Sequence, residues 1–294
     1  MAPRGGGRRQ SRPDSGVSGM VIVDKPTGMT SHDVVDRVRT ALGTRKVGHA
    51  GTLDPDATGV LVLGVGQGTK LLQFVTGVDK TYVGEMVLGV ETSTLDAAGE
   101  VLATFDMTVT PAQVAAAAGE FVGDILQIPP MVSAVKVNGK RLHELAREGK
   151  EIEREPRPVT VHQLTTAPTT DPLVYRLEVS CGSGTYIRSL AADIGTALGG
   201  GAHLRALRRT SVGTFLLDRA SHLDDIVLHP VADLLGSMPR VEVDEVVAAQ
   251  VQNGRSLGPA PGAGQMAIVA PDGQVLAIYE ARDGEFRPVK VLAP

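Results

Sequence analysis

The segment Gly48-His49-Ala50-Gly51-Thr52-Leu53-Asp54-Pro55-Asp56-Ala57-Thr58-Gly59 is the most unusual stretch of this sequence. Its glycines and its proline predict a loop, and the apolar residues Val60–Val65 directly after it predict a buried strand. Pro55 fixes its own φ and restricts Asp54, so the Asp54 carboxylate is held in one direction. A carboxylate in a loop that leads into a rigid strand is a candidate catalytic group. Taken alone, however, an Asx-type turn closed by Asp54 is the simpler interpretation.

The composition around this segment is that of an ordinary globular protein. The chain has 294 residues, 42% hydrophobic and 21% charged, which excludes wholesale disorder. At roughly 150 residues per domain, this length predicts about two domains. No apolar run approaches the roughly 20 residues that a membrane helix needs, and the Arg- and Gly-rich N-terminus lacks the apolar core of a secretory signal. The single cysteine, Cys181, excludes internal disulfides and Cys-based zinc sites. We therefore expect a cytoplasmic protein.

The charge of the chain is slightly acidic, but basic residues gather locally. The net charge is -4 and the pI is about 6.0, so a generally basic nucleic-acid-binding coat is excluded. Basic residues outnumber acidic ones in residues 1–19, 136–150 and 201–210, and the last segment holds Arg205, Arg208 and Arg209 with no acid. A solvated surface explains any one cluster, whereas three clusters in an acidic chain favour a polyanionic partner.

The hydrophobic pattern up to about residue 228 mixes strands and helices without a regular βαβ rhythm. This mixture predicts an α+β fold rather than a doubly wound sheet. The expected elements are a strand at Gly19–Asp24, a helix capped by Ser31 and closed by Gly43, a strand at Val60–Val65, a short helix at Leu71–Val75, a strand at Thr81–Val90, a helix from Thr110 to Val122, a short helix at Leu142–Glu148, a strand at Leu173–Ser180 and a helix from Ile187 to Leu198.

The two ends of the chain have different patterns. Residues 1–18 contain little that could be buried, and we expect a disordered tail. A break falls near Leu228–Arg240, and the turns Asp272-Gly273 and Asp283-Gly284 beyond it predict hairpins. We therefore expect a small C-terminal β-rich domain, with strands at Val241–Val247, Met266–Ala270, Gln274–Tyr279 and Phe286–Leu292.

A second candidate constellation is Cys181-Gly182-Ser183-Gly184-Thr185-Tyr186-Ile187-Arg188. Ile187 belongs to the buried face of the following helix, so Arg188 must point elsewhere, and in a cleft it could pair with a carboxylate and keep that carboxylate ionised. In isolation a surface position is the simpler interpretation for Arg188, as a core position is for Tyr82.

The sequence contains fragments of cofactor-binding and metal-binding motifs, and each of them lacks a required residue. Gly64–Lys70 resembles a phosphate-binding loop, but Leu71 stands where Ser or Thr should hold magnesium. Gly182-Ser183-Gly184 lacks the third glycine of a dinucleotide-binding fingerprint, and Arg147 stands where a zinc-binding helix would place its second histidine after His143. We therefore expect neither a cofactor nor a metal.

Six motifs in order make the sequence resemble the TruB family of bacterial tRNA pseudouridine-55 synthases, over roughly residues 19–215. The motifs are Asp24–Ser31 (DKPTGMTS), the Gly48–Gly59 loop, Lys80-Thr81-Tyr82, Pro129–Lys136 (PPMVSAVK), Gly184–Leu190 (GTYIRSL) and Gly201–Arg209 (GAHLRALRR). One such motif is weak evidence, whereas six in family order favour catalytic roles for Asp54, Tyr82 and Arg188 together.

The resemblance implies an architecture and an activity. It implies a pseudouridine synthase fold with a mixed, largely antiparallel sheet and flanking helices over residues 19–235, an RNA-gripping insertion at 129–155 and a PUA-like RNA-binding domain at 240–294. The implied activity is isomerisation of uridine 55 in the T-arm loop of tRNA, by base flipping and without a cofactor. The implied partner is tRNA, with no membrane, no obligate protein partner and a monomeric state.

The resemblance also implies roles for individual residues. Asp54 matches the catalytic carboxylate of the family, Arg188 its basic partner, and Tyr82 the tyrosine that stacks on the target base. The substrate-binding residues implied are Tyr186 and Leu207 in the pocket wall, Lys25 beside the site, His49 against the RNA loop, and Lys136, Arg208 and Arg209 as basic contacts.

Three other functions stay open on the sequence alone. The first is a non-catalytic RNA-folding or RNA-binding protein that retains the scaffold, and the intact set of Asp54, Tyr82 and Arg188 argues against it. The second is a guide-RNA-dependent synthase that acts on ribosomal RNA with partner proteins. The third, a metabolic nucleotide enzyme, is disfavoured because every phosphate motif fails.

Overall fold

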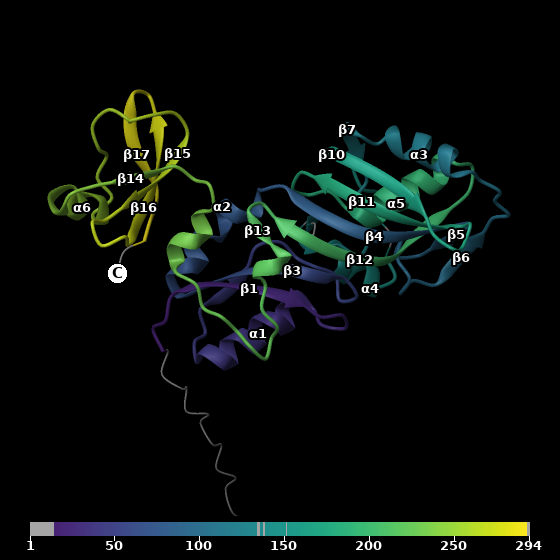
Figure 1. Cartoon of the computed structure of the whole chain (residues 1–294), viewed down its shortest axis with the longest axis horizontal. Coiled ribbons are helices and arrows are strands. Elements are labelled where there is room, and N and C mark those ends of the chain that lie inside the picture. The colour runs from purple at the N-terminus through teal and green to yellow at the C-terminus, as the bar shows by residue number, and fades with distance from the viewer. Residues whose placement is uncertain (1–14, 134–135, 138, 151, 293–294) are drawn as a thin grey trace, which may run out of the picture.

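A mixed sheet organises the larger part of the chain, as the computed structural model shows for residues 15–133, 136–137, 139–150 and 152–292 (Figure 1). Its strand order is β1-β3-β12-β4-β11-β10-β7, with β2 paired to β3 and β13 to β12. Within this sheet β3 and β12 run parallel and the other paired strands are antiparallel. The strands are β1 (Gly19–Lys25), β2 (Val47–His49), β3 (Thr58–Val65), β4 (Lys80–Leu88), β7 (Gly123–Gln127), β10 (Arg157–Pro168), β11 (Val174–Cys181), β12 (Ala202–Val212) and β13 (Phe215–Leu216).

Helices cover the sheet on both sides of its β1–β3 end and on one side of its other strands. Apolar residues of α3 (Pro111–Gly119) and α5 (Ile187–Ala197) pack on β4, β11 and β12. The alternating side chains of β1 and β3 divide between α1 (Ser31–Leu42) on one face and α2 (Leu72–Thr76) on the other. The remaining short elements are β5 (Val90–Thr92), β6 (Val101–Thr104), β8 (Lys136–Val137), β9 (Lys140–Arg141), α4 (Leu142–Arg147) and the 3₁₀ turns η1 (Gly66–Leu71), η2 (Leu217–Arg219) and η3 (Val231–Leu235).

The C-terminal residues form a second, smaller sheet with one helix. Its strands are β14 (Arg240–Glu242), β15 (Gln265–Val269), β16 (Val275–Arg282) and β17 (Glu285–Val291), in that order, beside α6 (Glu245–Gln252). Figure 1 shows this unit as a separate lobe next to α2 and β1. Ala267, Val269 and Ile278 share a buried cluster with Met20 and Ile22 of β1, so the two lobes pack together through apolar contacts.

The predicted α+β class and the C-terminal β-rich lobe are confirmed, and both predicted hairpin turns connect antiparallel strands. One predicted strand is wrong: Val241–Val247 begins as β14 but continues as α6, because Asp244 accepts a hydrogen bond from the Val247 N–H and caps a helix. The first helix also starts one residue earlier than predicted. Thr30, not Ser31, is the N-cap, in a capping box with Asp33.

Of the predicted 1–18 tail, residues 1–14 lie outside the described residues. The Ser15 hydroxyl donates to the Leu42 carbonyl oxygen, 2.9 Å away, so the described part of this segment contacts the end of α1.

Candidate active site

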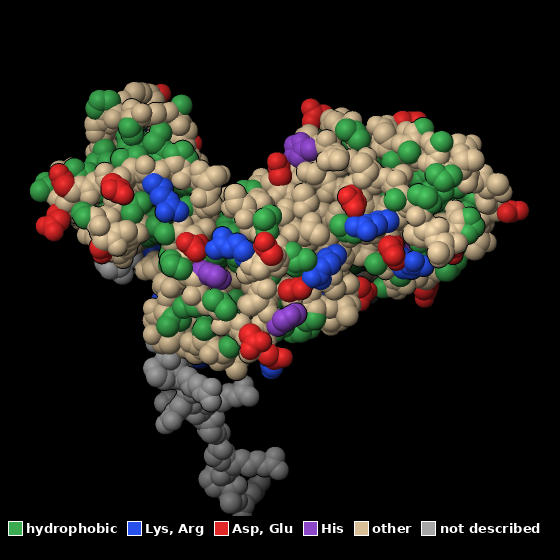
Figure 2. Space-filling model, in the orientation of Figure 1, with side chains coloured by type: hydrophobic (Ala, Val, Ile, Leu, Met, Phe, Trp, Pro, Cys, Tyr) green, Lys and Arg blue, Asp and Glu red, His purple; other side chains and the backbone are tan. Residues whose placement is uncertain are grey.

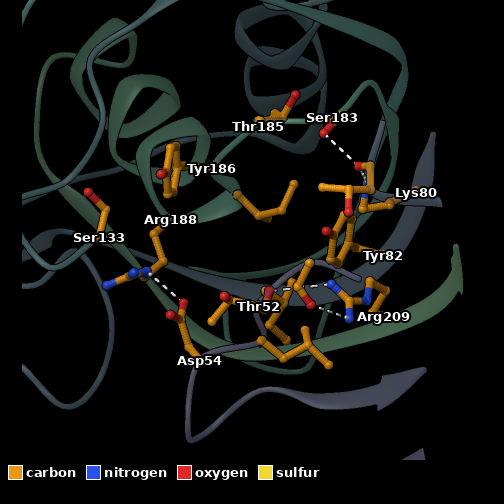
Figure 3. A pocket seen from close by; sticks show the side chains of 16 residues that line it. Thr52, Asp54, Lys80, Tyr82, Ser133, Ser183, Thr185, Tyr186, Arg188 and Arg209 are labelled. Atoms are coloured by element: carbon orange, nitrogen blue, oxygen red, sulfur yellow. Dashed lines mark hydrogen bonds and ion pairs between the residues drawn. The ribbon is translucent and has the colours of Figure 1, made fainter. Parts of the chain in front are cut away.

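The two candidate motifs meet at one cavity of about 250 Å³ between the sheet and the N-terminus of α5. The glycine-rich loop contributes Gly51–Asp54, and Ser183–Arg188 come from the turn before α5 and the first two residues of that helix. β4 and β12 supply further lining side chains, which stand opposite Asp54 (Figure 3), and Thr76 of α2 and Ser133 complete the lining. Of the predicted site residues, the cavity therefore brings together Asp54, Tyr82, Tyr186, Arg188, Leu207 and Arg209.

Asp54 and Arg188 form the ion pair that the sequence suggested. The Arg188 Nε lies 3.1 Å from the Asp54 Oδ2, and the Arg188 side chain is only 4% exposed while that of Asp54 is 40% exposed. Arg188 is the second residue of α5, and its side chain turns away from the apolar helix face toward the Asp54 loop, as Figure 3 shows. The carboxylate thus has a fixed cationic partner and one side open to the cavity.

Arg188 is itself held by a second acid that the sequence analysis missed. Its Nη1 lies 3.1 Å from the Asp96 Oδ2 and also donates to the Thr94 carbonyl oxygen, while Nη2 donates to the Val132 carbonyl oxygen. Asp96 follows Leu95, which has a positive φ of 62°, in a turn before β6. An aspartate in a turn is common, and no local motif singles it out; only the tertiary fold brings it to Arg188.

The position of Asp54 raises its pKa. Burial is the main cause, the nearby charge of Asp96 adds to it, and the Arg188 guanidinium opposes it. The arginine was expected to keep the carboxylate ionised. Arg188 does act in that direction, but the net shift is upward because desolvation outweighs the ion pair.

The backbone of the Asp54 loop is fastened by buried polar side chains from the first motif. Ser31 both donates to the Leu53 carbonyl oxygen and accepts from the Leu53 N–H. The Lys25 ammonium is fully buried and donates to the carbonyl oxygens of Pro26, Met29 and Pro55. Burial lowers the pKa of Lys25 to about 8. The structure thus places Lys25 beneath the loop, where it reaches Pro55, the residue after Asp54.

Gly59 allows the same loop to enter β3. It has a φ of +101°, and a Cβ there would overlap the backbone of Arg209 in β12. We expect Gly59→Ala to lower the free energy of unfolding by about 2–4 kcal/mol, because backbone atoms rather than a flexible side chain must move.

Gly119 of α3 provides a matched control, since nothing lies within 4 Å of its hypothetical Cβ. Gly119→Ala should be neutral or stabilise by up to about 1 kcal/mol. Urea unfolding of both variants checks the expectation, and equal midpoints for Gly59→Ala and the unsubstituted protein would contradict it.

Tyr82 lies on β4, where its side chain is 9% exposed and lines the cavity. Burial raises the pKa of its phenol. Tyr186 is fixed by Gln127 of β7, which accepts from the Tyr186 N–H at 2.7 Å and donates to its carbonyl oxygen at 3.0 Å. Leu207 completes the wall from β12. The aromatic and apolar walls that the sequence predicted therefore face the Asp54–Arg188 pair.

Two other predicted contact residues, His49 and Arg208, do not line this cavity. His49 is half-buried on β2, and burial lowers its pKa. Arg208 pairs with Asp24 at 2.7 Å and donates to the Thr58 hydroxyl. Lys136 begins β8, and its side chain lies outside the described part of the structure.

Arg209 differs most from its predicted role as a basic RNA contact. It is 1% exposed, and its guanidinium donates to the backbone carbonyl oxygens of Val60, Thr52 and Gly51. The reason is the register of β12, a strand that the sequence analysis did not predict, which alternates Arg208 outward and Arg209 inward. Arg205 pairs with Glu85. On the face in Figure 2, basic side chains accordingly lie beside acidic ones rather than in a single patch.

Within the described residues, no group of three or more His, Cys, Asp or Glu side chains could hold a metal ion. The same part of the chain contains no helix long and apolar enough to cross a membrane.

Comparisons with known proteins agree over nearly the whole chain. The N-terminal domain model of the TruB family pseudouridylate synthases matches residues 39–187. Two C-terminal models follow: the tRNA pseudouridylate synthase B C-terminal domain at residues 188–237, and the C-terminal domain of tRNA pseudouridine synthase II at 238–293.

Relatives named tRNA pseudouridine synthase B resemble the chain over its length. The Arthrobacter sp. (strain FB24) protein is 44% identical, covering 95% of this chain and 97% of the relative. The Thermobifida fusca protein is 45% identical, covering 94% and 98%. Among solved structures, a Cbf5-Nop10-Gar1 complex matches with a TM-score of 0.73 and 26% identity, covering 94% of this chain and 85% of the matched chain.

Proposed function

The chain belongs to the TruB family of pseudouridylate synthases, and we propose that it isomerises uridine 55 in the T-arm loop of tRNA, with Asp54 as the catalytic carboxylate. The observation that carries the assignment of Asp54 is its ion pair with the buried Arg188 in the wall of the cavity that Tyr82 and Leu207 also line. The relatives named tRNA pseudouridine synthase B support tRNA as the substrate.

The reaction requires a positioned carboxylate from the protein and no cofactor. The bond between N1 of uracil and C1′ of ribose breaks, the base rotates, a bond forms between C5 and C1′, and the proton on C5 leaves while N1 gains one. The product is an isomer, so no electrons or groups are exchanged with a cofactor. Asp54 serves either as nucleophile or as the base that removes a sugar proton, and both roles start from the ionised carboxylate.

Tyr82 and the pocket walls replace the stacking contacts that the base loses when it is flipped out of the RNA loop. Extrusion of a base costs on the order of a few kcal/mol. Stacking on one aromatic ring returns about 1–3 kcal/mol, and contacts to phosphates add more. In this proposal the base stacks on Tyr82, between the walls formed by Tyr186 and Leu207, with its C1′ next to Asp54.

RNA binding outside the pocket is assigned to the segments that carry basic residues away from the core. These are the 129–155 insertion with Lys136, the surface near His49 and Arg208, and the C-terminal lobe from residue 240, which we propose acts as a PUA-like RNA-binding domain. The chain would work as a monomer in the cytoplasm, where its buried free Cys181 stays reduced.

The test uses the purified full chain, an unmodified tRNA transcript and an isolated T-arm hairpin, with pseudouridine mapped by mass spectrometry. We expect one pseudouridine, at position 55, in both RNAs without any added guide or protein. The likeness to a solved structure titled as an archaeal box H/ACA sRNP Nop10-Cbf5 complex, at 25% identity, favours a guide-dependent synthase as the second candidate. Activity only with guide RNA and partner proteins would support that candidate, and tight binding with no turnover would support an RNA-folding protein.

The pH dependence of the reaction should report the charges around Asp54. Burial and Asp96 raise the pKa of Asp54. As the solution is acidified, activity should therefore be lost at a higher pH than it would be if Asp54 had the pKa of an ordinary aspartate. Asp96→Asn removes one cause of that rise, so the acidic limb of kcat/KM should move to lower pH. An acidic limb that stays in place or moves to higher pH would contradict the assignment of that limb to Asp54.

A further inference from the structure

We propose that the end of β7 positions the catalytic pair, with Gln127 as a positioning residue: its buried carboxamide fixes the backbone at the start of α5, from which Arg188 reaches Asp54. This inference rests on the proposed function, since it concerns the same active site. Gln127 does not itself line the cavity, so its effect on the reaction must pass through the residues that it holds.

Gln127 stands where the strand pattern favours an apolar side chain. Side chains alternate along β7, so that Ile125 packs against the buried cluster of α3 and α5 while Leu126 is exposed. Gln127 projects to the same side as Ile125 and is only 2% exposed. Burial of a carboxamide is unfavourable unless its polar atoms have hydrogen-bond partners. An apolar side chain would fill this place without that requirement, which points to a use for the carboxamide itself.

Both ends of the carboxamide bind the backbone of one residue. Oε1 of Gln127 accepts from the Tyr186 N–H at 2.7 Å, and Nε2 donates to the Tyr186 carbonyl oxygen at 3.0 Å. The same carbonyl oxygen accepts the first hydrogen bond of α5, from the Leu190 N–H at 3.1 Å. Tyr186 is the N-cap of this helix and makes no capping bond with its own side chain. Gln127 therefore holds the point at which α5 begins.

The residues that follow Gln127 hold the same helical turn at two further points. The Ser189 hydroxyl donates to the Ile128 carbonyl oxygen at 3.1 Å, and Nη2 of Arg188 donates to the Val132 carbonyl oxygen at 2.8 Å. Three residues at the start of α5 are thus bound by one segment, whose contacts lie 56 to 61 residues away in the sequence.

The ion pair with Asp54 depends on where this turn lies. Nε of Arg188 is 3.1 Å from the Asp54 Oδ2, and Arg188 follows Tyr186 by two residues at the edge of the cavity (Figure 3). Misplacement by about 1 Å in an active site costs on the order of 10²-fold in rate. Loss of the two Gln127 bonds should let the turn shift relative to the Asp54 loop, which weakens the ion pair without removing either partner.

The test compares Gln127→Met with Gln163→Met in the full chain. Methionine is close to glutamine in size and is readily accommodated in a core, but it can form neither of the two bonds to Tyr186. Gln163 is exposed on the neighbouring strand β10, so its variant controls for the replacement itself. Ser189→Ala removes only the contact with Ile128 and provides a second, milder variant of the same turn.

The acidic limb of kcat/KM separates positioning from a general loss of stability. Burial has the largest influence on the pKa of Asp54 and raises it, and the Arg188 guanidinium has the next largest and lowers it. The other charged groups that act on this carboxylate are Asp96, Lys25 and Asp56. A looser contact with Arg188 should therefore raise the pKa of Asp54 and move the acidic limb to higher pH.

With a T-arm hairpin as substrate, we expect Gln127→Met to move the acidic limb to higher pH, to lower kcat about tenfold and to leave KM within about threefold. Ser189→Ala should give smaller changes in the same directions, and Gln163→Met should give none. An acidic limb that stays in place in Gln127→Met, or a loss expressed only in KM, would overturn the proposal.

Hydrogen exchange at the Arg188 Nε–H provides a second readout that needs no RNA. This proton lies between a buried guanidinium and Asp54, and its nuclear magnetic resonance signal is assigned by its absence in Arg188→Lys. We expect its exchange to accelerate by about threefold or more in Gln127→Met and to stay unchanged in Gln163→Met. Equal exchange rates in Gln127→Met and the unsubstituted chain would contradict the proposal.

The two readouts keep this inference separate from the proposed function. If the unsubstituted chain makes no pseudouridine, the proposed function fails, and the exchange rates alone decide whether Gln127 positions Arg188. If Gln127→Met fails to fold, Ser189→Ala decides by the same two measurements, and no change in either would overturn the proposal.

Discussion

Asp54→Asn is expected to abolish pseudouridine formation while the variant still binds T-arm RNA. The amide keeps the shape of the side chain and its contact with Arg188, but it can neither attack carbon nor accept a proton at neutral pH. Catalysis by a positioned base or nucleophile contributes about 10²–10⁴-fold, so we expect turnover to fall by about 10³-fold or more. Single-turnover assays with excess enzyme, together with filter binding of the same RNA, separate chemistry from affinity.

Asp56 supplies the control for this substitution, since it lies two residues further along the same loop and is exposed. Asp56→Asn changes the charge of the loop by the same amount and should keep most of the turnover. If Asp54→Asn retained turnover comparable to Asp56→Asn, the assignment of Asp54 as the catalytic carboxylate would be refuted.

Arg188→Ala is expected to have the second largest effect, on both turnover and stability. Without the guanidinium, Asp54 and Asp96 face each other as two carboxylates with no cation between them, and the pKa of Asp54 rises because the charge that lowers it is gone. Removing one partner of a fully buried pair costs about 3–5 kcal/mol. Since Asp54 is partly exposed and screened by water, we expect about 2 kcal/mol here.

Turnover should fall more than RNA affinity in Arg188→Ala, and its acidic limb should move to higher pH, opposite to Asp96→Asn. Arg188→Lys should recover stability better than activity, because an ammonium keeps the charge but cannot reach Asp54, Asp96 and two carbonyl oxygens together. Urea unfolding and the pH profile of kcat/KM measure both effects. Equal losses of affinity and turnover, with no change in pH profile, would show that Arg188 holds RNA rather than the carboxylate.

The sequence predicted the elements whose causes are local. The αL-forming Gly43 ends α1 as expected, the Asp-Gly turns connect β15 to β16 and β16 to β17, and the apolar run after Gly59 is the buried strand β3. The prediction that Arg188 leaves the apolar face of its helix also agrees with the structure, because helical periodicity alone excludes it from that face.

The missed features depend on residues far apart in the chain. β12 lies inside the sheet between β3 and β4, yet its sequence AHLRALRRTSV is interrupted by arginines and lacks the pattern of a buried strand. Those arginines are tolerated inside the sheet because Arg208 pairs with Asp24 and Arg209 donates hydrogen bonds to backbone oxygens of the Asp54 loop. Asp96 was missed for the same reason, since its partner Arg188 is 92 residues away.

The most direct test of the whole account is a crystal structure of the chain with a T-arm hairpin that carries 5-fluorouridine at position 55, where fluorine replaces the hydrogen lost from C5. We expect that nucleotide to be turned out of the RNA loop, with its base against Tyr82 and its C1′ within about 4 Å of an Asp54 carboxylate oxygen. A nucleotide that stays stacked in the RNA loop, or that binds away from the Asp54–Arg188 pair, would contradict the account.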